Sequence, residues 1–149
     1  MNPNARPSER VAICNALNPI SSVAVQTGGW VAAKDFYKFL AIIQAGVIGA
    51  AATVDAKLQQ ATDSAGTGVK DITGKAITQF TKAGTDDNKQ AEINCNQTDL
   101  DIANGFTHLR LVITPATAAS LVAGLLLGFD ARLPPASDTD ASTVDEIVG

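Results

Sequence analysis

The stretch from residue 36 to residue 60 reads FYKFLAIIQAGVIGAAATVDAKLQQ. Its apolar first part, residues 36–44, stops at Gly46 and Gly49, and strict alternation of polar and apolar residues follows at residues 53–59. A turn rich in Gly, Ser, Thr and Asp comes next, before a short extended piece at residues 69–74. Alternating runs between Gly-rich turns are typical of strands, so this stretch predicts a β protein.

The same rhythm continues along the chain and indicates about eight strands. We expect them at residues 11–16, 23–33, 36–44, 53–60, 69–80 with a break at Gly74, 89–96, 107–114 and 119–132. Pro19 and the pair Ser21-Ser22 are expected to end the first strand, and the pair Gly28-Gly29 to bend the second. Residues 97–105 hold the one expected helical turn. The pattern favours an all-β fold, an antiparallel β-sandwich of the jelly-roll type.

Two of the expected strands have a distinctive distribution of side chains. Residues 36–44 are apolar on both faces, with Phe36, Leu40 and Ile42 on one and Tyr37, Phe39, Ala41 and Ile43 on the other. A strand of this kind is either central in its sheet or covered by another protein. In the last strand Gly124 and Gly128 lie opposite a row of larger residues, so we expect close approach to the backbone there. That row is Leu121, Ala123, Leu125, Leu127 and Phe129.

The chain of 149 residues suits one domain, which we place at residues 11–135. Residues 1–10 are polar and contain prolines, so they predict an extended arm without an export signal. Residues 136–149 carry Asp138, Asp140, Asp145 and Glu146 and no basic residue, which predicts an acidic flexible tail.

Composition excludes two classes of partner. The net charge is −4 and the eleven Lys and Arg residues are scattered, so no nucleic-acid partner is expected. Residues 36–54 are long enough to consider as a membrane helix, but Lys38, Gln44 and the glycines argue against it. Only 17% of residues are charged, below the usual quarter, as is common where protein packs on protein.

No constellation of catalytic, cofactor-binding or metal-ligating residues is found in the sequence. The single histidine, His108, has no second histidine to complete a metal site, and Asp99 and Asp101 have ordinary turn chemistry. Trp30 is expected to be a core or interface aromatic, with a sugar-stacking platform as the alternative. Cys14 and Cys95 are expected to be small buried apolar residues, although a disulfide between them stays open.

Several segments together resemble small structural proteins of tailed bacteriophages and prophages. They are Gly29-Trp30-Val31, residues 35–46, 52–60, 69–79 and 107–114, so the resemblance covers roughly residues 23–132. It implies a non-enzymatic virion protein of the capsid decoration (cement) type, needing no cofactor. Such a protein is made in the host cytoplasm and binds the capsid exterior, bridging major capsid subunits. Its partners would be the major capsid protein and copies of itself, and threefold capsid sites make a homotrimer attractive.

Exposure, rather than any family motif, suggests which residues assemble. We expect contacts from Arg6, Arg10, Val11, Trp30, Pro134, Ile147 and Val148. Two alternatives remain open: a head–tail connector or tail or baseplate component of the virion, and a carbohydrate-binding β-sandwich in host adhesion.

Overall fold

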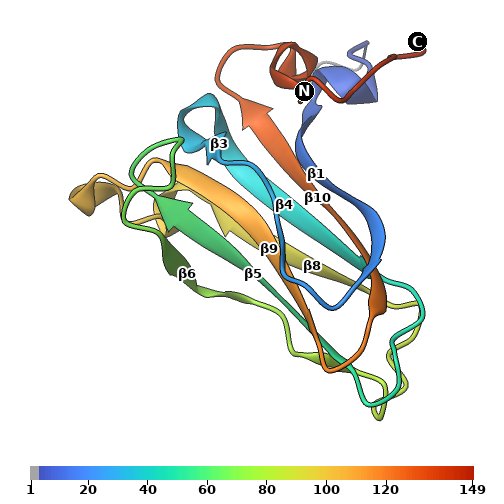
Figure 1. Ribbon diagram of the computed structural model, residues 1–149. Helices are drawn as coiled ribbons and strands as arrows, with labels where there is room; N and C mark the ends of the chain where they lie inside the picture. Colours follow the sequence, from blue (N-terminus) through green and yellow to red (C-terminus); the bar gives the residue numbers. More distant parts are fainter. Residues whose placement is uncertain (1–3) are drawn as a thin grey trace.

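The computed structural model describes residues 4–149 and shows two antiparallel sheets packed face to face (Figure 1). One sheet has the order β1-β10-β4-β8: β1 (Val11–Ser22), β10 (Ser120–Ala131), β4 (Phe36–Ala45) and β8 (Gln90–Asn96). The other has the order β2-β9-β5-β6: β2 (Gln26–Thr27), β9 (His108–Ala116), β5 (Thr53–Ala61) and β6 (Lys70–Ala76). Two short strands complete it, with β3 (Val31–Ala32) on β9 and β7 (Phe80–Thr81) on β5.

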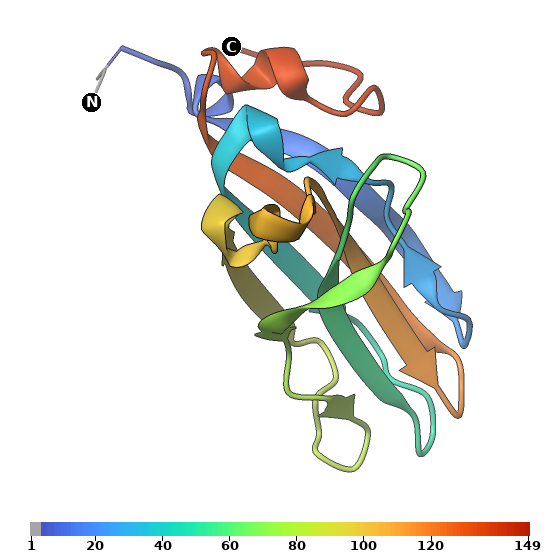
Figure 2. The same cartoon turned by 90° about the vertical axis from the view of Figure 1, so that its left-hand side faces the viewer.

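The strand order is that of a jelly roll, which confirms the predicted fold class. Along the chain, strands alternate between the sheets except from β5 to β6, which stay in the same sheet, and β2 with β3, and β6 with β7, act as split strands. The connections are turns and short 3-10 helices: η1 (Pro7–Glu9), η2 (Ala33–Asp35), η3 (Gln97–Asp99), η4 (Ile102–Asn104) and η5 (Ala136–Thr139). In Figure 2, η3 and η4 lie beside the end of β8. The expected helical turn at residues 97–105 is therefore a pair of 3-10 turns.

The core lies between the sheets and follows the alternation of the strands. Val54, Ala56 and Leu58 of β5 point inward, as predicted, and so do Leu109, Leu111 and Ile113 of β9. From the facing sheet come Phe39, Ala41 and Ile43 of β4. Phe36 was expected on the face of Leu40 and Ile42, but it is buried and meets Phe39 edge-to-face, with ring centroids 5.8 Å apart.

The first strand is longer than predicted. Pro19 does not end it, because β1 runs to Ser22 with shifts of register between Ile13 and Asn15 and between Leu17 and Ile20. Since β1 is an edge strand, a residue without an N–H is tolerated at an irregular position. The expected bend at Gly28 is instead the gap between β2 and β3, where Asn15 Oδ1 comes within 2.6 Å of the position of a Gly28 Cβ.

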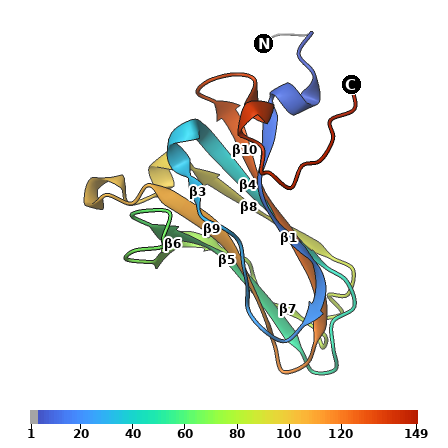
Figure 3. The same cartoon turned by 45° about the horizontal axis from the view of Figure 1, so that its top comes forward.

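Both ends of the described chain lie at the same end of the sandwich (Figure 3). The arm expected at residues 1–10 is not extended where the structure describes it, since η1 turns it at Pro7–Glu9; residues 1–3 lie outside the described residues. The domain boundary at residue 135 also shifts, because Ala136 is fully buried. Asp140 Oδ1 accepts a hydrogen bond from the Ile13 N–H at 2.6 Å, and the Ala141 N–H donates to the Ile13 carbonyl at 2.7 Å. The first part of the acidic tail thus covers the edge of β1.

Replacing Asp140 by Ala is expected to loosen this contact. The Ile13 N–H loses a charged acceptor in a partly buried position, which costs about 1–2 kcal/mol of unfolding free energy. Hydrogen exchange of the Ile13 amide should accelerate relative to the core amides of β9. The matched control is Asp138→Ala, an exposed tail position; equal exchange at Ile13 in both variants would contradict the contact.

The two cysteines are free. Cys14 lies on β1 and Cys95 on β8, the two opposite edges of one sheet, so about three strand spacings of 4.8 Å separate them. This distance is too long for a disulfide. Burial is the main cause that raises the pKa of each thiol to about 12, so both are neutral side chains of the inner face. Within residues 4–149, no helix has the length and apolar character needed to cross a membrane.

Candidate assembly surface

The outer face of the sheet β1-β10-β4-β8 is apolar at its centre. Along β10 the buried positions are Ser120, Val122, Gly124, Leu126 and Gly128, so the intervening residues point away from the core. The intervening residues are partly exposed, with Leu121 at 46%: Leu121, Ala123, Leu125, Leu127 and Phe129. Gly124 and Gly128 face the core, where there is no space for a side chain. A Cβ at residue 124 would lie 2.7 Å from Leu111 Cδ2, and a Cβ at residue 128 would lie 2.7 Å from the Phe36 ring. The close approach predicted at these two glycines is confirmed.

The register of the sheet extends this row on both sides. Val11, Ile13 and Ala16 of β1 stand beside Phe129, Leu127 and Leu125. Leu40 and Ile42 of β4 stand beside Leu127 and Leu125. We call the whole set the apolar face: Val11, Ile13, Ala16, Leu40, Ile42, Leu121, Ala123, Leu125, Leu127 and Phe129.

Polar groups border the apolar face. On the β8 side the outward residues are Gln90, Glu92, Asn94 and Asn96, all exposed. At one end Lys38 Nζ pairs with Asp130 Oδ2 at 2.8 Å, so the charges there neutralise each other. An apolar centre with a polar rim is the composition of a protein–protein contact rather than of a solvent-facing sheet.

The apolar face is also hollowed. Because Ala123 is small between two leucines, cavities of about 360 and 290 Å³ flank it, and both also include Pro19 and Gln44 in their walls. A third cavity of about 300 Å³ lies between Leu40, Phe129 and the polar rim. These hollows can receive side chains from a partner surface.

The other sheet turns a polar face outward. Lys57 Nζ meets Asp71 Oδ2 at 2.7 Å, Arg110 Nη2 donates to Gln59 Oε1 at 2.8 Å, and Gln79 Nε2 donates to Asp55 Oδ2 at 2.7 Å. Neighbouring side chains thus satisfy one another, as on a surface that faces water. The sandwich therefore has two different outer faces, one apolar at its centre and one polar.

The size of the apolar side fits a specific contact. Four strands spaced about 4.8 Å apart and about ten residues long, at about 3.3 Å per residue, give a projected face of roughly 600 Å². A typical stable interface buries about 800 Å² of accessible surface per partner. Since a corrugated face has more accessible surface than its projection, this sheet alone approaches the area that a stable contact needs.

The residues that we expected to make assembly contacts lie on different parts of the molecule. Val11 belongs to the apolar face. Trp30 lies over the polar sheet, where the Arg110 guanidinium stacks 4.4 Å from the ring centroid. Ile147 and Val148 are 49% and 85% exposed near the C-terminus. Arg6 lies against Gly149, whose Cβ position would be 2.5 Å from Arg6 Nη1.

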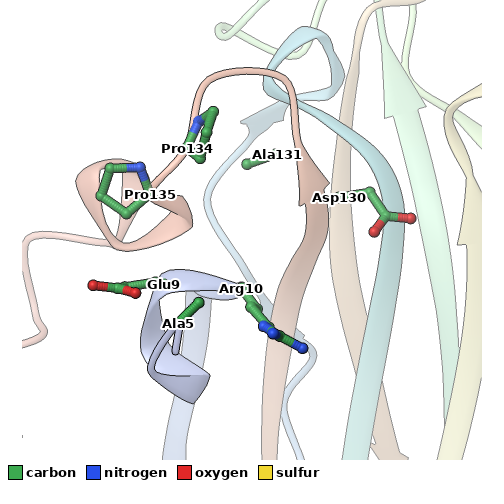
Figure 4. A pocket seen from close by; sticks show the side chains of 7 residues that line it. All are labelled: Ala5, Glu9, Arg10, Asp130, Ala131, Pro134 and Pro135. Carbon is green, nitrogen blue, oxygen red and sulfur yellow. The ribbon is translucent and has the colours of Figure 1, made fainter. Parts of the chain in front are cut away.

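Arg10 and Pro134 lie at the end of the sandwich where the termini meet. They line a cavity of about 740 Å³ together with Glu9, Asp130 and Pro135 (Figure 4). This cavity mixes one basic and two acidic side chains with prolines, and none of the apolar face reaches it. It is a separate feature from the apolar face.

Sequence reasoning missed the central members of the apolar face, Leu40, Ile42, Leu125 and Leu127. The sequence did contain a signal for an apolar outer face: residues 36–44 are apolar on both sides, and β10 has glycines on one side and leucines on the other. Sequence alone did not say which side of β10 points inward.

The residues considered for chemistry are engaged locally. His108 Nδ1 lies 2.9 Å from Thr107 Oγ1, and Asp99 Oδ2 pairs with Lys75 Nζ at 2.9 Å. Asp101 pairs with Lys70. Among residues 4–149, no group of three or more His, Cys, Asp and Glu side chains is arranged to hold a metal ion.

Turn carboxylates stabilise the end opposite the termini. Lys82 donates to Asp87, which also accepts the Ile48 N–H at 2.9 Å, and these bonds lower the pKa of Asp87. Lys89 Nζ at 2.8 Å and the Thr81 N–H at 2.9 Å likewise lower the pKa of Asp86. The loops before β5 and β8 are thereby tied together.

Acidification is therefore expected to destabilise the protein. A carboxyl group with a lowered folded pKa contributes stability above its unfolded pKa, about 3.9 for Asp, and this is lost as the pH falls through the folded pKa. The thermal midpoint should be flat above about pH 5 and fall below about pH 4. Calorimetry from pH 2 to 7 measures this, and Asp87→Asn should reduce the slope. A midpoint that rises on acidification would contradict these contacts.

The fold and this surface define a small jelly-roll domain with one apolar outer face. No protein-family model matches the chain, and no curated protein matches its sequence. Among solved structures, a chain of broad bean stain virus is similar at a TM-score of 0.41 and 14% identity, over 72% of this chain and 62% of that one. A chain of tobacco necrosis virus is similar at 0.39 and 13%, over 83% and 95%. This chain thus spans less than two thirds of the broad bean stain virus chain. Both TM-scores are below 0.5.

Proposed function

We propose that this protein is a non-enzymatic structural component of a virion, and that it acts as a capsid decoration (cement) protein. In this role it lies on the capsid exterior with its apolar face against major capsid subunits and its polar sheet toward solvent. Jelly rolls occur in viral capsid domains, in lectins and in cupins, so fold alone does not give the function. The contrast between the two outer faces carries the proposal.

The mechanism is burial of apolar surface across subunit boundaries. The ten residues of the apolar face become buried on binding. Each Å² of apolar surface removed from water contributes roughly 25 cal/mol to the binding free energy. A decorated lattice offers many equivalent sites, so modest single contacts gain from multivalency when copies also touch each other. The bound copies then hold neighbouring capsid subunits together against the pressure of the packaged genome.

The carbohydrate-binding alternative has less support from the geometry. Sugar stacking needs an open aromatic face. The Arg110 guanidinium already covers one face of Trp30, and Gly66 lies so close that its Cβ position is 2.6 Å from Trp30 Nε1. The polar side therefore presents a packed tryptophan and not a platform.

Particles purified from cells that express the tagged chain together with the rest of its genome test the proposal. We expect the chain to sediment with genome-filled particles in many copies, on the capsid exterior in electron micrographs. A chain that remains in the soluble fraction would overturn the virion role. A few copies confined to the neck or tail would overturn the cement role and support the connector alternative.

A further inference from the structure

The four edges of the two sheets are not alike. The β1 edge contains Pro19, two shifts of register and the tail contact at Ile13. On the second sheet, β2 and β3 have two residues each, and β6 has a shift of register and Gly74 at a φ of +73°. Among the sheet edges that residues 4–149 form, only β8 is a regular edge of seven residues without proline, glycine or bulge. Interrupted edges are how monomeric sheets avoid pairing with other chains, and β8 has none of these devices.

The hydrogen-bonding pattern shows which groups of β8 are exposed. Gly46 N–H bonds to the Leu121 carbonyl, and Ala45 N–H bonds to the Lys89 carbonyl. Because bonded pairs alternate along an antiparallel ladder, Ala91, Ile93 and Cys95 bond to β4. The N–H and carbonyl groups of Gln90, Glu92 and Asn94 therefore point away from the sheet. Among residues 4–149 no strand other than β4 pairs with β8, while the Asn96 N–H is bonded to Asp99 at 2.7 Å.

We propose that β8 pairs with β8 of a second copy of this chain, antiparallel and about a twofold axis at Ile93. This register places Glu92 opposite the partner's Asn94 and Gln90 opposite the partner's Asn96. A register centred on Glu92 would set two like charges directly opposite each other, which is unfavourable. The register centred on Ile93 also pairs the full length of β8. In it the Asn96 carbonyl accepts a hydrogen bond from the partner copy, while the Asn96 N–H keeps its bond to Asp99.

The occupant is a second β8 and not a β1 edge, because the tail, Pro19 and the shifts of register obstruct β1. Pairing of β8 with β8 uses the same surface on both copies, so it closes after two subunits and does not extend into a fibre. The result is one continuous eight-stranded sheet across the dimer. The apolar face is left free, so this pairing does not rest on the proposed function. It predicts a twofold contact where capsid symmetry had suggested a trimer.

The oligomeric state of the purified chain, measured by light scattering and sedimentation, tests the proposal. The wild type is expected to be a dimer. Glu92→Pro removes an outward N–H that takes no part in the monomer, and proline is tolerated at such an edge position, so the variant should fold. It should self-associate at least about tenfold more weakly. Glu92→Gln keeps the N–H and should remain a dimer, with thermal midpoints of all three within a few degrees.

Cross-linking tests the register. Residues directly opposite in a bonded pair have Cα atoms about 5.5 Å apart, within the range of a disulfide. An oxidised mixture of the single variants Glu92→Cys and Asn94→Cys should give a covalent dimer, and either variant alone should not. Wild type reports any background from Cys14 and Cys95.

A monomer at every concentration, a dimer unaffected by Glu92→Pro, or cross-linking of either variant with itself would each overturn the proposal. A chain that is monomeric alone and gains protection of the β8 amides only in particles would show that a strand of another protein occupies the edge. That outcome overturns the twofold pairing while leaving the virion role intact.

Discussion

Gly128→Val is expected to lower the free energy of unfolding by about 3 kcal/mol, because it overfills the core between the sheets. A Cβ at residue 128 would lie 2.7 Å from two ring atoms of Phe36 and 2.8 Å from Cys14 Sγ. Phe36 is 1% exposed and packs on Phe39, so its ring has no space to move into. Urea denaturation followed by tryptophan fluorescence and circular dichroism measures the change.

The matched control for this variant is Ala123→Val on the same strand. Ala123 points outward beside one of the hollows, so the added methyl groups meet solvent and the stability should change by about 0.5 kcal/mol or less. The pair of variants distinguishes the two sides of β10. Equal effects, or a larger effect at residue 123, would mean that the row of leucines faces the core and that no apolar face exists.

Leu125→Lys is expected to leave the isolated chain folded and to weaken its association with particles by about a hundredfold or more. The side chain lies at the middle of the apolar face, so a lysine there would be buried against the capsid without a partner, which costs several kcal/mol. In the free chain the same lysine reaches water. Quantitative co-sedimentation with particles lacking the wild-type chain measures the loss of binding.

Thr114→Lys is the control for this experiment, since it places the same residue at a central strand of the polar sheet. Thr114 stands beside Asp55, so a lysine there gains an acidic neighbour and remains in solvent. Its association should equal that of the wild type. If both lysine variants bind equally well, the apolar face is not the capsid contact; if only Thr114→Lys fails, the two faces have exchanged roles.

Much of the fold follows from local patterns. The alternation at residues 53–59 predicted β5 and the inward set Val54, Ala56 and Leu58, because only one side of this strand is apolar. The same reasoning succeeded for Leu109, Leu111 and Ile113 of β9. The jelly roll followed from the number and spacing of such strands. Patterns failed where long-range pairing overrides a local signal, as at Pro19, which an irregular edge strand tolerates.

The amino-acid sequence alone determined that this chain forms strands and that its charges are few and scattered. It also determined that the last strand has glycines on one side and large apolar residues on the other. Which side of that strand faces the core required the folded arrangement, because Leu111 and Phe36, distant in sequence, occupy the space above Gly124 and Gly128. The same holds for the apolar face itself. Its members come from β1, β4 and β10, and only the register of the sheet places them side by side.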